Sequence, residues 1–335
     1  MPAILIIVLA ALLESGCSFL PQVYEYHDPL TPQEHLALGV SYESEGNADL
    51  AIAEYKKVIE SKAPDQSVTA RVFLGNVYAG LEQYDAAISY LKQTTARDPQ
   101  NLPFRLILAH SCLWSKQYQC VLDVYHQILQ LNAESAEADM LAGEALDEMQ
   151  DHAGAIEQFR AAVKANPREP NVHFGLGYLL WTQSQYEEAA QEFQAELANV
   201  PNNAQALAFL ADSKMKLNDR EAALPLLKKA AAIDPDLEIA HIDLAAVYSD
   251  SGRNVEALRE LKVAARLKPN DVNVHWRLAR LYQAMGRKNE AKLEFEQTKN
   301  LTKAADASVF RQLNNVRTKP NPWPRAAAAQ SNTRH

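Results

Sequence analysis

Histidine and cysteine, the side chains that most often carry catalysis or hold metals, are few in this sequence: nine and three of 335 residues. No Gly-rich phosphate loop, His-Glu-x-x-His helix, paired-cysteine metal motif or Gly-x-Ser-x-Gly turn occurs. His173, His241 and His275 are separated by multiples of 34 residues, as equivalent positions of stacked helices would be. Packed helices lie roughly 8–10 Å apart, too far for these side chains to share a metal at about 2 Å. We therefore expect no catalytic residue, no cofactor and no metal, and a protein that is not an enzyme.

Two of the cysteines, Cys112 and Cys120, fall at a core position of one expected helix and near the start of the next. They would pair as a disulfide in an oxidising compartment. The alternative is two buried free thiols, and the sequence alone favours that alternative.

The composition is typical of a folded protein, and the net charge argues against nucleic-acid binding. Apolar residues make up 47% and charged residues 22%, with a formal net charge of -9. Residues 306–335 hold five Lys or Arg and one Asp, so the rest of the chain is more acidic still. A surface that binds phosphate backbones is therefore not expected.

The first residues have the pattern of an export signal. Residues 3–13 are an unbroken apolar run, shorter than the roughly 20 residues that span a bilayer but typical of a signal-peptide core. The Glu14-Ser15-Gly16-Cys17 that follows resembles the lipobox of bacterial lipoproteins, although Glu14 stands where an apolar residue is usual. The resemblance implies an export signal over 1–17, lipidation of Cys17 and, with Ser18 next, an outer-membrane location. The alternative is an uncleaved signal anchor.

Residues 18–31 contain prolines that disfavour helix and are expected to form an extended tether. Thr31-Pro32-Gln33-Glu34 then offers a capping hydroxyl, a proline at the first helical position and an acid in the first turn. A helix should begin here.

A period of 34 residues organises the chain from Pro32 to Ala305 into eight units. The units are 32–67, 68–101, 102–135, 136–169, 170–203, 204–237, 238–271 and 272–305. The eighth residue of every unit is Gly or Ala, and the twentieth is Ala in seven of the eight. Large apolar residues stand beside these small ones, so paired helices can approach closely and interdigitate. Prolines end five of the second helices: Pro99, Pro167, Pro201, Pro235 and Pro269.

This pattern resembles the tetratricopeptide repeat. The resemblance implies an all-α fold, a right-handed α-solenoid of eight helix-turn-helix units. Residues 306–316 are expected to form a capping helix and 317–335 a disordered tail. The sixth unit departs from the pattern, with Lys214 at a usually apolar position and Pro225 early in its second helix. We interpret this as a local irregularity that the repeat tolerates; the alternative is a weak unit at which the superhelix bends.

The resemblance also implies a concave groove lined by the first helices. The residues expected to face a partner are His110, Trp114, Met140, Glu144, Asp147, Glu148, Phe174, Tyr178, Trp181, Asp212, Trp276 and Arg280. Aromatic and acidic side chains dominate this set, which suits a helix or extended peptide with basic and apolar side chains.

The sequence thus predicts a non-enzymatic scaffold that binds proteins or peptides, no nucleic acid, and the membrane only through its N-terminus. We expect it in the bacterial cell envelope, facing the periplasm, as a lipid-anchored part of a larger assembly. One alternative is a soluble cytoplasmic adaptor. The other is an accessory subunit of an envelope enzyme, such as a glycosyltransferase complex.

Overall fold

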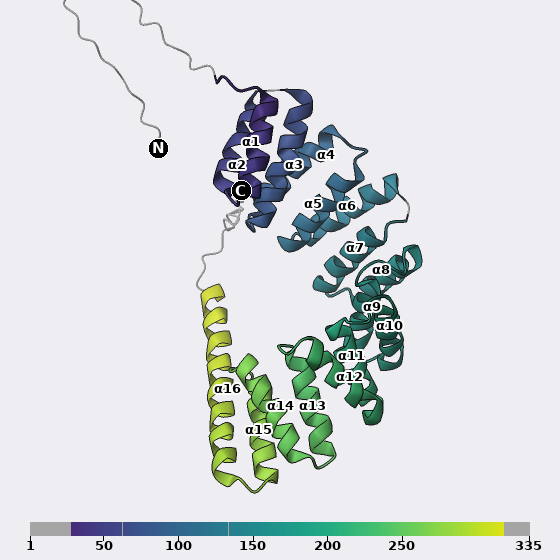
Figure 1. The fold of residues 1–335 in the computed structure, drawn as a ribbon, viewed down its shortest axis with the longest axis vertical. Coiled ribbons are helices and arrows are strands. Elements are labelled where there is room, and N and C mark those ends of the chain that lie inside the picture. The colour runs from purple at the N-terminus through teal and green to yellow at the C-terminus, as the bar shows by residue number, and fades with distance from the viewer. Residues whose placement is uncertain (1–27, 62, 133, 318–335) are drawn as a thin grey trace, which may run out of the picture. The chain divides into compact units, whose positions relative to one another are not determined.

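The computed structural model describes residues 28–61, 63–132 and 134–317. It divides into two compact bodies, an N-terminal body that ends at Val77 and a C-terminal body that begins at Tyr78. The described residues form sixteen α-helices and no strand, so the predicted all-α helical-repeat solenoid is confirmed (Figure 1).

Each repeat unit contributes two helices. The first helices are α1 (Pro32–Ser44), α3 (Pro64–Gly80), α5 (Leu102–Trp114), α7 (Ala136–Glu148), α9 (Val172–Thr182), α11 (Ala204–Lys216), α13 (Glu238–Asp250) and α15 (Val272–Ala284). The second helices are α2 (Ala48–Glu60), α4 (Tyr84–Arg97), α6 (Tyr118–Leu131), α8 (His152–Ala165), α10 (Tyr186–Asn199), α12 (Arg220–Ile233), α14 (Asn254–Leu267) and α16 (Lys288–Arg317).

Local signals set where these helices begin and turn. Thr31 and Glu34 form a reciprocal capping box at α1, in which the Glu34 carboxylate accepts from the Thr31 backbone N–H at 2.7 Å. The fifteenth residue of every unit has a positive φ, and it is Gly only at Gly46, Gly252 and Gly286. The other five units hold a side chain in this left-handed conformation, which the packing of the hairpin must stabilise.

Three elements differ in extent from the sequence pattern. Helix α3 starts at Pro64, four residues before the aligned start of its unit, and a proline is compatible with the first helical turn. Helix α9 starts at Val172, after the left-handed Asn171. Helix α16 runs without interruption through residues 306–316, where a capping helix was expected. Pro225 lies inside α12.

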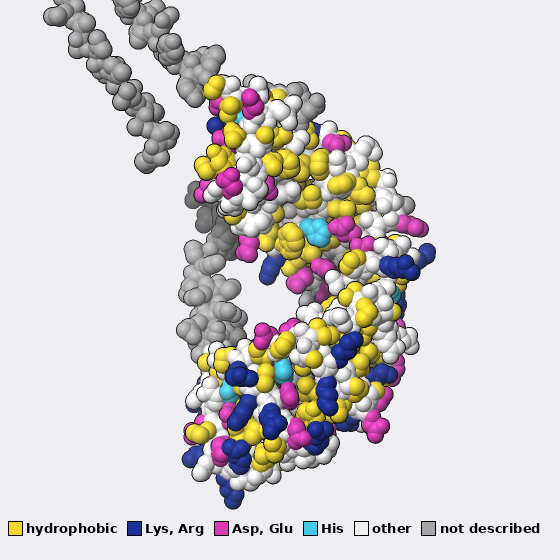
Figure 2. Space-filling view, in the orientation of Figure 1, with side chains coloured by type: hydrophobic (Ala, Val, Ile, Leu, Met, Phe, Trp, Pro, Cys, Tyr) yellow, Lys and Arg dark blue, Asp and Glu magenta, His cyan; other side chains and the backbone are white. Residues whose placement is uncertain are grey.

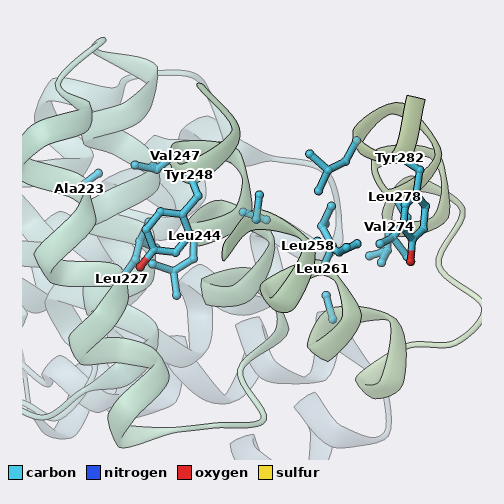
Figure 3. Close-up of a cluster of buried hydrophobic side chains, with 14 of the residues drawn as sticks. Ala223, Leu227, Leu244, Val247, Tyr248, Leu258, Leu261, Val274, Leu278 and Tyr282 are labelled. Atoms are coloured by element: carbon cyan, nitrogen blue, oxygen red, sulfur yellow. The ribbon is translucent and has the colours of Figure 1, made fainter. Parts of the chain in front are cut away.

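Small residues face aromatic rings inside the hairpins. A Cβ built on Gly143 would lie 2.6 Å from Cδ2 of Phe159, and one on Gly39 would meet the ring of Tyr55 at 2.6 Å or less. These rings are at most 4% exposed. The apolar core continues from one unit to the next, as Figure 3 shows for side chains from α12, α13, α14 and α15. The glycines therefore allow the helices to close over the rings.

In the C-terminal body, each helix packs on the next along the chain, and neighbouring first helices also contact one another. The contacting first helices are α5 with α7, α7 with α9, α9 with α11, and α11 with α13. In a curved stack of hairpins, the helices on the inner side of the bend lie closer together than those on the outer side. Contact between successive first helices therefore places them on the inner side. The first helices therefore line the inner surface of this body.

A histidine–glutamate pair recurs between the two helices of four units. The fourth residue is His and the twenty-third is Glu in His35–Glu54, His173–Glu192, His241–Glu260 and His275–Glu294, with Nδ1 and Oε2 2.6–2.7 Å apart. The other four units have neither residue at those positions. His at the fourth position thus occurs only in units that also have Glu at the twenty-third. Because each such pair joins the two helices of its unit, these histidines have a structural role.

In units seven and eight the other ring nitrogen faces a backbone carbonyl. His241 Nε2 lies 3.0 Å from Pro235 O, and His275 Nε2 lies 2.9 Å from Pro269 O. Both partners of each ring only accept, so both nitrogens must carry protons. The Glu260 hydrogen bond raises the pKa of His241. Burial opposes the charge of His275, but the Glu294 hydrogen bond and the Pro269 carbonyl outweigh it and raise its pKa as well.

We expect units seven and eight to lose stability as pH rises. Because the folded-state pKa values are raised, the stabilisation is complete below the unfolded value of about 6.5 and is lost as pH climbs through the folded values. Replacing both His241 and His275 with Gln should remove about 1 kcal/mol per pair at low pH and little at high pH. Hydrogen exchange of α13 and α15 across that range measures this. His126→Gln, on an exposed histidine that bonds its own helix, is the control and should leave the pH dependence intact.

The expectation of two free thiols is wrong, because a disulfide joins Cys112 and Cys120. Cys112 lies in the last turn of α5 and Cys120 in the first turn of α6, and the hairpin turn brings their Cα atoms to 5.8 Å. Sequence spacing could not show this separation, because it depends on the crossing of the two helices. Unit three is therefore cross-linked.

Trypsin should report this bond directly, because Lys116 lies between the two cysteines. A non-reduced digest of the protein, purified without reductant, should contain the two flanking peptides as one disulfide-linked species that separates on reduction. Reduction should also lower the stability of the α5–α6 hairpin by about 2–3 kcal/mol, the loop-closure value for so short a loop. Two free thiol peptides in the non-reduced digest would contradict the bond.

Candidate protein-binding groove

A pocket with a volume of about 490 Å³ lies on the inner surface of the C-terminal body, across units three to five. We call it the central pocket. It is lined by Leu113, Trp114, Lys116, Tyr118, Met140, Glu144, Asp147, Glu148, Phe159, Asn171, Phe174, Gly175, Tyr178 and Leu179. Seven of the twelve predicted contact residues are in this lining, contributed by α5, α7 and α9.

Two aromatic side chains form an open apolar wall of the central pocket. Trp114 is 54% exposed and Tyr178 is 40% exposed. The Trp114 ring packs beside Tyr84 and His110, with centroids 5.9 and 5.5 Å away, and these contacts hold it in place. Exposed aromatics held in a fixed orientation lose little entropy on binding and bury much apolar area. This wall suits the apolar side chains of a partner.

Helix α7 supplies the acidic side of the central pocket. It carries five acidic residues and no basic residue. Asp147 is 2.7 Å from His152 Nδ1, and Glu148 accepts from the Tyr118 hydroxyl at 3.1 Å. Glu144 is exposed at the pocket, but nearby protein atoms partly desolvate its carboxylate and raise its pKa, an effect that His110 only partly offsets. A cationic group entering the pocket would therefore stabilise the Glu144 carboxylate.

Trp181 and Asp212 were predicted to face a partner, but they bind each other. Trp181 Nε1 donates to Asp212 Oδ2 at 2.6 Å, and Asp212 is only 7% exposed. Phe209, which the sequence analysis did not select, packs against Trp181, Tyr178 and Phe174 with centroid separations of 5.2–5.9 Å. Its sixth place in unit six lies outside the expected groove positions, but an aromatic residue there was visible in the sequence. This cluster fixes the far wall of the central pocket.

The last two predicted residues lie in a second pocket, of about 360 Å³, between α13 and α15. We call it the C-terminal pocket. Trp276, which is 46% exposed, and Arg280 line it together with Arg277, Ser249 and other residues of these helices. The remaining predicted residue, His110, borders the central pocket through its contact with Trp114.

The described part of the chain offers neither a metal site nor a membrane span. No three His, Cys, Asp or Glu side chains there are grouped to hold an ion. No described helix is long and apolar enough to cross a bilayer. Cys17, the predicted lipidation site, lies outside the described residues.

Models of the tetratricopeptide repeat match residues 35–65, 70–103, 140–204, 214–273 and 249–307. The chain belongs to the tetratricopeptide-repeat family. Such repeats typically form non-catalytic scaffolds for protein–protein interaction, and a concave surface lined by successive units is their binding surface. The two pockets therefore lie where this tetratricopeptide-repeat protein would receive a protein or peptide partner.

Two other proteins are similar in sequence to parts of this chain. BBSome complex member BBS4 of Bos taurus is 26% identical over 170 residues, which is 50% of this chain and 32% of the relative. Cellulose synthase operon protein C of Pseudomonas fluorescens is 26% identical over 236 residues, 69% of this chain and 16% of the relative. The chain thus spans about a third or less of these relatives.

Among solved structures, a tetratricopeptide repeat protein from Parabacteroides merdae superposes with a TM-score of 0.57 at 15% identity. The match covers 79% of this chain and 98% of that one. At this identity the likeness concerns the fold alone.

Gly175 should be sensitive to a single added methyl group. A Cβ there would overlap Cε1 of Phe159, and both residues line the central pocket. Gly175→Ala should destabilise the protein by about 1–3 kcal/mol through overpacking, more than the roughly 1 kcal/mol gained in helix propensity. Urea unfolding measures the difference. Gly80→Ala is the control, because nothing lies within 4 Å of its added methyl. Equal effects of the two changes would show that close packing at Gly175 is unimportant.

Proposed function

We propose that this protein is a scaffold of a bacterial cell-envelope assembly, anchored by a lipid on Cys17, that binds a segment of a partner protein in the central pocket. The observation that carries the binding part is the combination of exposed aromatics with an acidic helix. Trp114 and Tyr178 offer apolar area, and Glu144 lies between them without an ion-pair partner among the described residues. The partner segment is therefore one with basic and apolar side chains.

The disulfide supports an envelope location. Such bonds form and persist in oxidising compartments such as the periplasm and are rare in the bacterial cytosol. A soluble cytoplasmic adaptor, the alternative location, would keep Cys112 and Cys120 as thiols. The relative named for a cellulose synthase operon favours a second candidate role, an accessory subunit of an envelope polysaccharide enzyme. In that role the enzyme itself would be the partner that occupies the groove.

Location and anchoring can be tested in a bacterium that expresses the full chain with a labelled fatty acid. Label should enter the wild type and disappear in Cys17→Ala, and the wild type should fractionate with the envelope. An unlabelled protein in the cytosolic fraction would contradict the anchored location and leave the scaffold role intact.

Partner binding can be tested with a photo-cross-linking residue placed at Tyr178, in the central pocket. Cross-links to envelope proteins should appear. They should weaken several-fold when Trp114→Ala is added, since an interface aromatic is worth about 1–2 kcal/mol, and less strongly when Glu144→Gln is added, because solvent screens that exposed charge. The same cross-linker at Val255, an exposed residue of a second helix, is the site control. Glu187→Gln, at an exposed position of α10, is the charge control. Cross-links that persist in both pocket variants would rule out the central pocket.

A further inference from the structure

The inner surface of the C-terminal body changes the sign of its charge from α7 to α15. Helix α7 carries five acidic residues and no basic one, whereas α15 carries two arginines and no acidic residue. On the face seen in Figure 2, Lys and Arg side chains gather over the C-terminal helices. Charges farther apart than a Debye length, about 8 Å at physiological salt, act independently. Two regions of one groove can therefore attract opposite charges.

The two arginines, Arg277 and Arg280, line the C-terminal pocket, and few carboxylates in the described part of the chain offset their charge. No carboxylate of the described residues forms an ion pair with Arg277 or Arg280. The Arg280 guanidinium lies 5.5 Å from the centre of the Trp276 ring, a cation–π contact that orients it. Arg277 Nε makes only a 3.3 Å contact, to Asn273 on its own helix. Both guanidiniums keep donors available for a ligand.

The acidic groups around the pocket are engaged elsewhere. Asp250, in the pocket lining, accepts from Arg220 Nε at 2.8 Å, so its charge is already offset. Asp243 faces Arg277 and Lys216 without an ion pair to either. Burial and the neighbouring Asp212 raise its pKa to about 7 against the effect of those two cations. At neutral pH, Asp243 is therefore only partly ionised and offsets the charge of Arg277 only in part.

The remaining lining suits a carboxylate. The Ser249 hydroxyl is exposed at the pocket, and a planar guanidinium binds a carboxylate through two parallel hydrogen bonds. The half-exposed Trp276 covers one side and can pack on the methylene groups of a Glu side chain.

We propose that Arg277, Arg280 and Ser249 form a binding site for an acidic side chain of the partner protein, and that this site and the acidic central pocket together fix the direction of the bound segment. The basic and apolar part of the segment lies over α5 to α9, and its acidic part lies over α13 and α15. This inference rests on the proposed binding of a partner segment in the groove.

A bipartite peptide tests the site on the full-length protein. One half contains Lys, Leu and Phe, the other is a run of Glu, and a flexible Gly-Ser linker of varied length joins them. The basic half alone is the reference probe. With a linker that spans both pockets, the Glu run should tighten binding by about tenfold, and this gain should fall with added salt. Fluorescence anisotropy measures both affinities.

The variant Arg277→Gln with Arg280→Gln should abolish the gain and leave binding of the basic half unchanged. Arg259→Gln, at an exposed position of α14, is the matched control and should preserve the gain. Circular dichroism melting of each variant shows whether the fold is retained. If the Glu run adds nothing at any linker length while the basic half binds, the acidic-side-chain site is overturned and the proposed function stands. If the basic half itself does not bind, the proposed function is contradicted, because the central pocket is then not the partner site. This outcome differs from loss of the Glu-dependent gain, which contradicts only the acidic-side-chain site.

Discussion

The close approach of the two helices in each hairpin is the contact on which the rest of this structure depends. A residue with little or no side chain at the eighth position, such as Gly143, leaves room for a ring from the second helix, such as Phe159. Interiors pack at crystal-like density, so even one added methyl group must displace a neighbour. The hairpin geometry is therefore set by a small number of positions that repeat every 34 residues.

Repetition of that geometry creates the binding surface. Because each hairpin packs on the next in the same way, the first helices come into contact and their remaining faces form one continuous inner surface. Side chains on this surface do not have to pack into the core, so Trp114 and Tyr178 can stay half exposed. The same freedom lets the charge change along the groove from the acids of α7 to the arginines of α15.

Polar groups inside the repeat are used to join helices rather than to carry chemistry. The His–Glu pairs link the two helices of a unit, and the Trp181–Asp212 hydrogen bond links two units. A buried polar group that lacks a partner destabilises the fold, so each of these side chains adds specificity to the pairing of its helices. The disulfide cross-links unit three in a similar way. The paired histidines and the two disulfide-bonded cysteines, residue types that often carry catalysis or bind metals, therefore stabilise the packing of helices here.

The sequence by itself determined the repeat period, the helical class and the helix faces, because small and large residues recur at fixed places along the chain. The resemblance to the tetratricopeptide repeat also placed most of the central-pocket residues, such as Trp114, Glu144 and Tyr178, on one surface. Only the tertiary structure decided which of these stay open, since Trp181 and Asp212 satisfy each other and Phe209 fills the space behind them. It likewise decided that Cys112 and Cys120 meet and that the His at the fourth position of four units faces a Glu across the hairpin. Periodicity fixes the face on which a side chain stands, but the distance between side chains on different helices depends on how the helices cross, and that comes from packing of the whole unit.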